Sequence, residues 1–321
     1  MVYRKKITVL AGIIAVLAVV YILTFIFDPQ RMGSRSDAYT WLDPQQKDRI
    51  GRIVIANAEQ TINLVRSDGQ WFVSHNGKNY PARQMRVDDF INVLTRRAPY
   101  PLRSSNASSH ERLSLTEETS MKVSVTGVAG QPMLNLLVGQ GDMTGQNVYL
   151  RKQGQNEVRS GEDRFSAYTG SELTSWFNLR LFPESESGSL DAASVQGLTV
   201  YPPADGGETR PYSFTRRNRQ WAISGMEIAD PDMGRIDGYV RDILNTAGDN
   251  FDDTVSPSDP MFNSSQIVLE LGDGSTRTIR LAPPQEDGRQ LATVTGSDLV
   301  YSLSPWTSGQ LFAESYYFEK D

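Results

Sequence analysis

Few side chains of this chain are of the types that carry out catalysis. The 321 residues include no cysteine and only two histidines, His75 and His110. A serine nucleophile needs a histidine base, and both histidines lie in polar, turn-like stretches, residues 74–77 and 104–111. Two isolated histidines without cysteine also make a poor ligand set for structural zinc. We therefore expect no enzyme activity, no catalytic residue, no cofactor and no metal site.

Two further stretches resemble ligand-binding loops. Residues 139–145 are glycine-rich, but a phosphate-binding loop leads from a strand into a helix, and this stretch leads into an expected strand at 148–152. We interpret it as a connection between strands. The carboxylates that crowd a later loop could bind calcium, although EF-hand spacing is absent; they are Asp249, Asp252, Asp253 and Asp259. A solvated acidic loop is the favoured interpretation, with calcium as the alternative.

The element expected to place the chain in the cell is an uncharged apolar run at residues 7–27, which is 21 residues long. At about 1.5 Å per residue, a helix of this length matches the ~30 Å hydrocarbon core of a membrane. The run is longer than the apolar region of a signal peptide, and no small-residue cleavage site follows it. The sequence predicts one uncleaved transmembrane helix over residues 7–27.

Charge sets the expected orientation of this helix. Arg4, Lys5 and Lys6 precede it, so residues 1–6 are predicted to stay in the cytoplasm of a bacterial cell and the bulk of the chain to lie in the periplasm. The part after residue 27 carries 29 basic and 38 acidic side chains. This acidic balance argues against nucleic-acid binding. Residues 28–49 are expected to form a juxtamembrane tether.

The rest of the chain shows an internal duplication. Gln70-Trp71 and Gln220-Trp221 each precede an apolar stripe of helical spacing, and the stripes end at Leu94 and Leu244, 23 residues after each tryptophan. The second helix is expected to begin with Asp230 as its N-cap and Pro231 at its first position. We expect a module at residues 50–182, a linker at 183–193 and a second, diverged module at 194–321.

Short alternating runs and turn dipeptides surround each helix. Asp68-Gly69 and Asp273-Gly274 are typical of tight hairpins between strands. We therefore predict an α+β fold, in which an N-terminal transmembrane helix precedes two modules of mostly antiparallel sheet with one main helix each. The predicted core markers of these modules are Trp71, Phe90, Leu94, Trp221, Val240 and Leu244.

Aromatic side chains offer an alternative to this core interpretation. Trp71 and Trp221 could stack on a ligand, but their equivalent placement favours a packing role. The aromatic residues near the C-terminus could form a last core layer, which we favour, or an exposed docking patch; they are Trp306, Phe312, Tyr316, Tyr317 and Phe318.

The order of these features resembles the bacterial domain-of-unknown-function 4340 family. The resemblance rests on Trp71, on the Tyr80-Pro81-Ala82 step into the helix at 86–94, on Val138-Gly139, on the strand at 149–151 and on Leu179-Arg180. It covers residues 50–182 well and 194–318 more loosely, where Ile228-Ala229-Asp230 stands in place of the Tyr-Pro-Ala step. Members of this family are typically membrane-anchored, extracytoplasmic and encoded beside ABC-type exporters of the gliding-motility kind, and no catalytic residues are known for them.

The favoured hypothesis is a non-enzymatic, membrane-anchored periplasmic accessory or scaffold subunit of an ABC-type export system, with transporter subunits as partners. The alternative is a periplasmic binding module for a lipid, glycan or peptide, with its site at the interface of the two modules. A hydrolase that uses two carboxylates is a third hypothesis, and it requires two close, buried acids.

Overall fold

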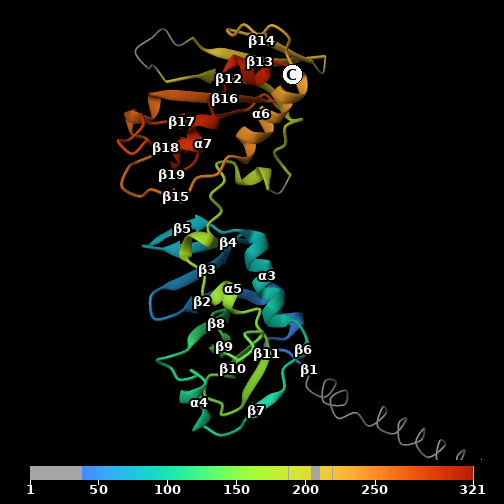
Figure 1. Ribbon diagram of the computed structural model, residues 1–321, viewed down its shortest axis with the longest axis vertical. Helices are drawn as coiled ribbons and strands as arrows, with labels where there is room; N and C mark the ends of the chain where they lie inside the picture. The colour runs from blue at the N-terminus through green and yellow to red at the C-terminus, as the bar shows by residue number, and fades with distance from the viewer. Residues whose placement is uncertain (1–37, 187, 204–209, 219, 321) are drawn as a thin grey trace, which may run out of the picture. The chain divides into compact units, whose positions relative to one another are not determined.

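The computed structural model describes residues 38–186, 188–203, 210–218 and 220–320, which divide into two compact units between Phe177 and Asn178 (Figure 1). The boundary thus precedes the linker expected at 183–193. Leu181 and Phe182, expected to close the first module, are buried in the core of the second unit. The described part of the expected tether, residues 38–49, belongs to the first unit, where Trp41 and Leu42 are buried.

The expected fold class, an α+β chain with an N-terminal transmembrane helix, is wrong. The described residues form three antiparallel sheets of two, nine and eight strands with few helices, so the fold is mostly β. The predicted span at residues 7–27 lies outside the described residues, and none of the helices described is long and apolar enough to cross a membrane. The sequence underestimates the sheets because strands such as β18 (Gln290–Val294), buried at every position, show no alternation of apolar and polar residues.

The first unit is built on the nine-stranded sheet, with strand order β5-β4-β3-β2-β8-β9-β10-β11-β7. Its strands are β2 (Ile50–Ala56), β3 (Thr61–Ser67), β4 (Gln70–His75), β5 (Lys78–Pro81), β7 (Leu102–Ser104), β8 (Met121–Gly127), β9 (Pro132–Gly141), β10 (Asn147–Lys152) and β11 (Val158–Glu162). A small second sheet pairs β1 (Ala38–Tyr39) with β6 (Ala98–Pro99). The turn between β3 and β4 has positive φ at Asp68 and Gly69, as a tight hairpin requires.

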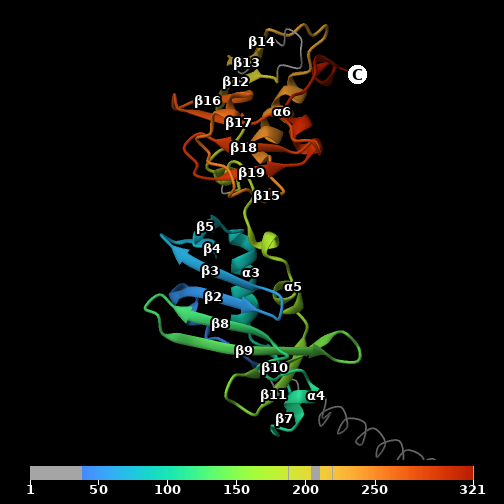
Figure 2. The ribbon, with the colours of Figure 1, turned by 90° about the vertical axis from the view of Figure 1, so that its left-hand side faces the viewer.

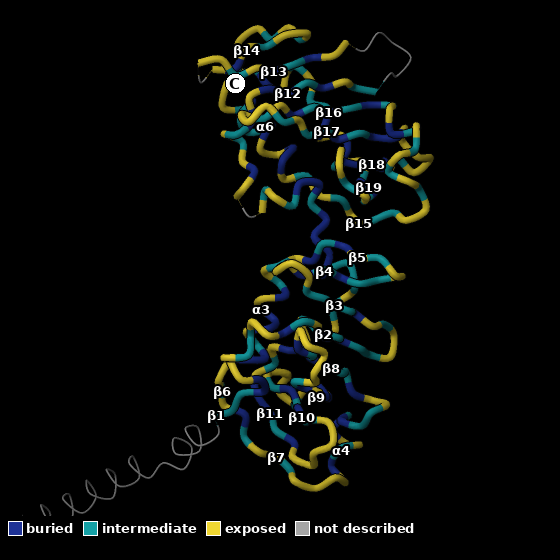
Figure 3. Tube along the Cα trace, turned by 180° about the vertical axis from the view of Figure 1, so that it is seen from behind, coloured by how far each residue is buried: buried dark blue, intermediate teal, exposed yellow. Residues whose placement is uncertain are grey.

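The main helix of this unit, α3 (Gln84–Thr95), lies against one face of the sheet (Figure 2). Its buried face consists of Val87, Phe90, Ile91, Leu94 and Thr95. The shorter helical segments are η1 (Pro44–Arg49), α4 (Ser109–Arg112), α5 (Ser166–Thr169) and η2 (Leu173–Trp176). Burial follows the central strands and the inner face of α3, while the turns are exposed (Figure 3).

The second unit repeats this plan with an eight-stranded sheet, in the order β14-β13-β12-β16-β17-β18-β19-β15. The remaining strands are β12 (Val195–Tyr201), β13 (Tyr212–Arg217), β14 (Gln220–Ser224), β15 (Asn250–Phe251), β16 (Ser265–Leu271), β17 (Thr276–Leu281) and β19 (Val300–Leu303). Its main helix is α6 (Met233–Asn245), and its short helical segments are η3 (Pro183–Ser185), η4 (Pro260–Asn263), α7 (Pro305–Gln310) and η5 (Ser315–Phe318).

Helix α6 begins later than the sequence indicated. Its N-cap is Asp232, whose carboxylate accepts hydrogen bonds from the amides of Gly234 at 2.8 Å and Arg235 at 3.3 Å. Asp230 instead accepts from Lys320, through its carbonyl at 3.0 Å and its carboxylate at 2.7 Å. The expected N-cap at Asp230 is therefore wrong, and Pro231 precedes the helix in a β-bridge with Glu319.

Strand for strand, the two large sheets match except at one edge. The order β4-β3-β2-β8-β9-β10-β11-β7 corresponds to β14-β13-β12-β16-β17-β18-β19-β15, and each main helix follows β4 or β14. Strand β5, which pairs with the outer edge of β4, has no counterpart among the described residues of the second unit. This difference leaves β14 as an edge strand.

Candidate functional site

The predicted core markers lie at the junction of sheet and helix in each unit. Their exposed fractions are 3% for Trp71, 0% for Phe90, 0% for Leu94, 5% for Trp221, 0% for Val240 and 2% for Leu244. The residue-by-residue correspondence between helices α3 and α6 differs from the one that the 23-residue interval indicated. The buried positions of α3 and α6 coincide at an offset of 149, so Tyr239 matches Phe90 and Ile243 matches Leu94.

The equivalent bridges that precede the helices support this offset. Ala82 pairs with Phe177 in the first unit, and Pro231 pairs with Glu319 in the second. The next residue in each unit, Arg83 or Asp232, is the helix N-cap. The connection between tryptophan and helix is therefore one residue shorter in the second unit. Pro231 takes the place of Ala82 and Met233 takes the place of Gln84.

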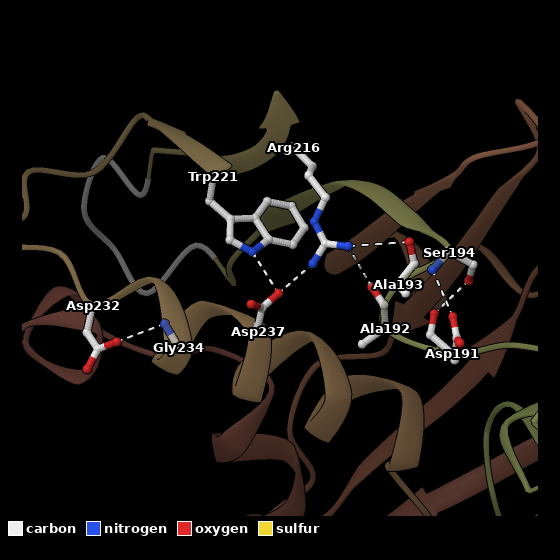
Figure 4. A network of polar contacts seen from close by, with 9 residues as sticks. All are labelled: Asp191, Ala192, Ala193, Ser194, Arg216, Trp221, Asp232, Gly234 and Asp237. Carbon is white, nitrogen blue, oxygen red and sulfur yellow. Dashed lines mark hydrogen bonds and ion pairs between the residues drawn. The ribbon is translucent and has the colours of Figure 1, made fainter. Parts of the chain in front are cut away.

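A polar network fixes Trp221 against helix α6 (Figure 4). Its indole nitrogen donates to Asp237 Oδ1 at 2.9 Å, and the same oxygen accepts from Arg216 Nη2 at 2.5 Å. The guanidinium carbon of Arg216 lies 4.5 Å from the centroid of the Trp221 ring, and Nη1 donates to the carbonyls of Ala192 and Ala193. These contacts hold the ring in place at the inner side of β14.

In the first unit, the chain itself satisfies the outer edge of β4 at Trp71. The Trp71 amide donates to Gln84 Oε1 at 2.8 Å. The Trp71 carbonyl accepts from the Ala82 amide at 3.1 Å and from Gln84 Nε2 at 2.9 Å. Strand β5 continues the pairing, with Tyr80 opposite Val73. Both backbone groups of Trp71 therefore have partners on the side away from β3.

In the second unit, the equivalent residues cannot make these contacts. Pro231 has no amide hydrogen to donate to the Trp221 carbonyl, and the thioether of Met233 cannot replace both functions of the Gln84 amide. The hairpin has the same register, since Arg216 pairs with Trp221 as Arg66 pairs with Trp71. Among the described residues, no strand pairs with the outer edge of β14. The outward backbone groups of Trp221 and Ile223 thus form an open edge.

A pocket of about 700 Å³ lies beside this edge. We call it the β14 pocket; its lining residues are Trp221, Ile223, Met226, Glu227, Ile228, Ala229, Pro231, Met233 and Glu319. Seven of its nine lining residues have apolar side chains, and two of these are methionines, which adapt in shape, while polar atoms make up about half of the exposed surface of the pocket. Its two charged side chains, Glu227 and Glu319, are both acidic. The arrangement suits a partner that combines apolar and basic groups.

Two buried tyrosines, Tyr212 of β13 and Tyr239 of α6, lie in the same core as Trp221. Tyr239 donates to the Leu311 carbonyl at 2.6 Å and Tyr212 to the Ala313 carbonyl at 3.1 Å, and their hydroxyls lie 3.3 Å apart. Burial raises the pKa of Tyr212 to about 12 and the pKa of Tyr239 well above its ordinary value. Both hydroxyls act as neutral structural donors.

The first unit has a smaller pocket of about 290 Å³, lined in part by Arg96, Arg103, Arg164 and Glu162. Arg164 donates to both oxygens of Glu162, at 2.9 and 3.0 Å, and this hydrogen bonding lowers the pKa of Glu162. Arg103 donates to Ser160 Oγ at 2.7 Å. The acid and one guanidinium therefore neutralise each other within the pocket.

No residue of the other predicted motifs lines either of the two pockets. His110 Nε2 lies 3.2 Å from the Asn156 carbonyl, and His75 ends β4. Residues 139–141 end β9 and residues 142–145 lie in its connection to β10, where Asp142 accepts from Thr144 and Asn147. In the acidic loop, Asp252 accepts from the amide and hydroxyl of Thr254. Within the described part of the chain, no three acidic or histidine side chains converge to hold a metal ion.

The C-terminal aromatic residues divide between the two interpretations that the sequence left open. Phe318 is fully buried and packs on Phe214, with ring centroids 4.9 Å apart. Trp306 and Tyr316 are 73% and 70% exposed. The aromatic stretch is therefore neither a continuous core layer nor wholly a surface patch.

Sequence reasoning missed the β14 pocket. Its one signal was that Ile228-Ala229-Asp230 departs from the Tyr80-Pro81-Ala82 step of the first copy. That departure marks the segment where β5 is lost. The side chains involved are apolar or singly acidic, so nothing in their types indicated a site.

A protein-family model described as a domain of unknown function, DUF4340, matches residues 71–260, which is more than half of the chain. The match begins at Trp71 in the first unit and ends in η4 of the second. No curated protein and no solved structure matches the chain.

Proposed function

This chain belongs to the DUF4340 family, and we propose that it is a non-enzymatic accessory subunit that binds a partner protein through the β14 pocket. The observation that carries the proposal is the open strand edge beside a pocket of about 700 Å³, whose lining combines seven residues with apolar side chains and two glutamates. An unpaired strand edge can capture an extended segment of another protein through backbone hydrogen bonds, and a pocket beside the edge can select its side chains.

The proposed partner class is a subunit of an ABC-type exporter. This choice rests first on the family resemblance, which implies an association with ABC-type exporters. It rests also on the excess of acidic side chains after residue 27, which suits a partner with basic segments. The proposed location is the bacterial inner membrane, with the two units on the periplasmic side. It rests on the uncharged residues 7–27 and on the basic residues that precede them.

The alternative of a binding module for a lipid, glycan or peptide has a specific observation in its favour for the peptide only. An open edge offers backbone donors and acceptors in a row, which match another backbone and have no equivalent in a lipid chain. We therefore retain peptide recognition as part of the proposal.

Site-specific photocrosslinking tests this function. A photoreactive residue at Glu227, in the pocket, is compared with one at Asp68, in the β3–β4 turn of the first unit, each in the full chain in native membranes. We expect an adduct with an exporter subunit, identified by its mass, from position 227 and not from position 68. The same adducts from both positions, or none from position 227, would contradict the proposal.

A further inference from the structure

We propose that the β14 pocket takes an extended segment of the partner, which adds to the sheet as an antiparallel strand and places an arginine or lysine opposite Ile223. This inference rests on the proposed function, since it specifies how the partner is bound. The inference follows from a comparison of the two units: β5 covers the outer edge of β4, and among the described residues no strand covers the outer edge of β14.

The first unit shows how such an edge is completed. Strand β5 is only four residues long, pairs antiparallel with β4 and places Tyr80 opposite Val73. The Tyr80 side chain is 1% exposed, and its ring lies 5.2 Å from that of Phe177. One short strand with one buried anchoring side chain therefore covers the outer edge of β4.

The second unit has the same edge without the strand. Trp221 and Ile223 occupy the positions of Trp71 and Val73, so their backbone groups point away from β13. The chain after β14 does not return as a strand in the described residues; Met226, Ile228 and Ala229 line the pocket instead. A segment from another protein can occupy this place and use the backbone pattern that β5 uses in the first unit.

The anchoring residue is expected to differ because its surroundings differ. Glu319 stands where Phe177 stands in the first unit, since each forms the bridge that precedes the main helix. A side chain opposite Ile223 therefore meets a carboxylate instead of an aromatic ring. Arginine and lysine have apolar stems that fit against Trp221 and the methionines, and a cationic head that can reach Glu319.

A peptide derived from β5 tests the mode of binding directly. The probe is the capped peptide of residues 77–81, Gly-Lys-Asn-Tyr-Pro, with a fluorescent label, in its natural form and with Tyr80→Arg; it stops before Ala82, whose place Pro231 already fills. Binding to the full chain is measured by fluorescence anisotropy. We expect the Tyr80→Arg peptide to bind about tenfold more tightly than the natural one. Glu319→Gln in the chain should weaken the arginine peptide about fivefold and leave the natural peptide unchanged.

A second variant closes the edge without damaging the fold. Pro231→Ala with Met233→Gln supplies the amide and the side chain that satisfy Trp71 in the first unit. We expect this double variant to unfold at the same or a higher temperature and to bind both peptides at least about tenfold more weakly. Met143→Gln, at a fully exposed loop position of the first unit, is the matched control and should bind as the unchanged chain does.

The outcomes separate this inference from the proposed function. If each peptide binds the double variant as tightly as it binds the unchanged chain, strand addition is overturned. Sedimentation could instead show a dimer of the unchanged chain that the double variant abolishes. The occupant of the edge would then be a second copy of the chain, and this result also overturns the inference. If peptide binding fails while the photoadduct at position 227 persists, the proposed function stands without this mode. If the peptide results hold and the adduct is absent, strand addition stands and the proposed partner is wrong.

Discussion

The indole nitrogen of Trp221 donates a 2.9 Å hydrogen bond to Asp237, which lies one turn into helix α6. The same carboxylate accepts from Arg216, whose guanidinium covers the indole ring at 4.5 Å. Asp237 thus links strand β14, which carries the open edge, to helix α6. In the first unit, Arg66 lies 6.0 Å from the Trp71 ring and donates to the Asp48 carbonyl.

Replacement of this acid should destabilise the chain. We expect Asp237→Ala to lower the free energy of unfolding by about 1–2 kcal/mol, because it removes the acceptor of both an indole and a guanidinium, and the carboxylate is itself 42% exposed. Asp242→Ala, at an exposed position of the same helix, is the control. Urea titration measures both, and equal effects would show that the network does not stabilise the unit.

Each tryptophan that precedes a main helix should be essential for packing. Trp71→Ala and Trp221→Ala are expected to cost roughly 3–5 kcal/mol each, as large-to-small changes in a core. Trp306→Ala, at a position 73% exposed, should change stability by less than about 0.5 kcal/mol. Thermal unfolding compares the three variants. An unchanged melting temperature for Trp71→Ala or Trp221→Ala contradicts a core role for that residue.

The buried tyrosine pair should make the chain less stable in strong base. The pKa of Tyr212 is raised from 10.0 to about 12, so between these values the unfolded chain loses a proton that the folded chain keeps. The contribution of this tyrosine to the free energy of unfolding is therefore constant below about pH 10. It falls by about 1–3 kcal/mol as the pH rises toward 12. Tyr212→Phe should reduce this fall, while Tyr316→Phe, at an exposed position, should not. Denaturant titrations at several pH values measure the difference.

The turn between β9 and β10 depends on a single carboxylate. Hydrogen bonds from Asn147 and Thr144 lower the pKa of Asp142 to about 2 from its ordinary 3.8. Whatever stability these bonds give is present above about pH 4 and lost as pH falls through 2. Asn147→Ala should raise the pKa of Asp142 toward its ordinary value, as followed by NMR titration of the side-chain carboxyl. A pKa that stays near 2 in this variant would assign the shift to Thr144 and the backbone amides.

The sequence predicted the duplication because strong local signals accompany it. Trp71 and Trp221 follow turns that require positive φ, at Asp68 and Asn218 among others, and the helical stripes have the 3.6-residue period. The equal 23-residue intervals nevertheless gave helix equivalences that are shifted by one residue. Both apolar stripes contain neighbouring apolar positions, so a shift of one still pairs Phe90 with Val240 and Leu94 with Leu244, although it places Val87 against Asp237.

The site could not be predicted from the sequence because it arises from contacts that are missing. Pro231 and Met233 are unremarkable in a sequence, and they gain meaning only beside the Ala82 and Gln84 contacts of the first unit. The size of the sheets was not predicted for a related reason. β15 is two residues long, and it belongs to the sheet through its pairing with β19. Such long-range pairing leaves no local pattern.

Amide hydrogen exchange at Trp221 and Ile223, compared with Trp71 and Val73 in the same chain, tests the open edge most directly. Without a partner, we expect the Trp221 and Ile223 amides to exchange at least about tenfold faster than their counterparts, the factor that ~1.4 kcal/mol of protection represents. The Tyr80→Arg peptide should slow both of them and leave Trp71 and Val73 unchanged. Equal protection of the two pairs in the free chain would contradict the central claim that β14 offers an unpaired edge.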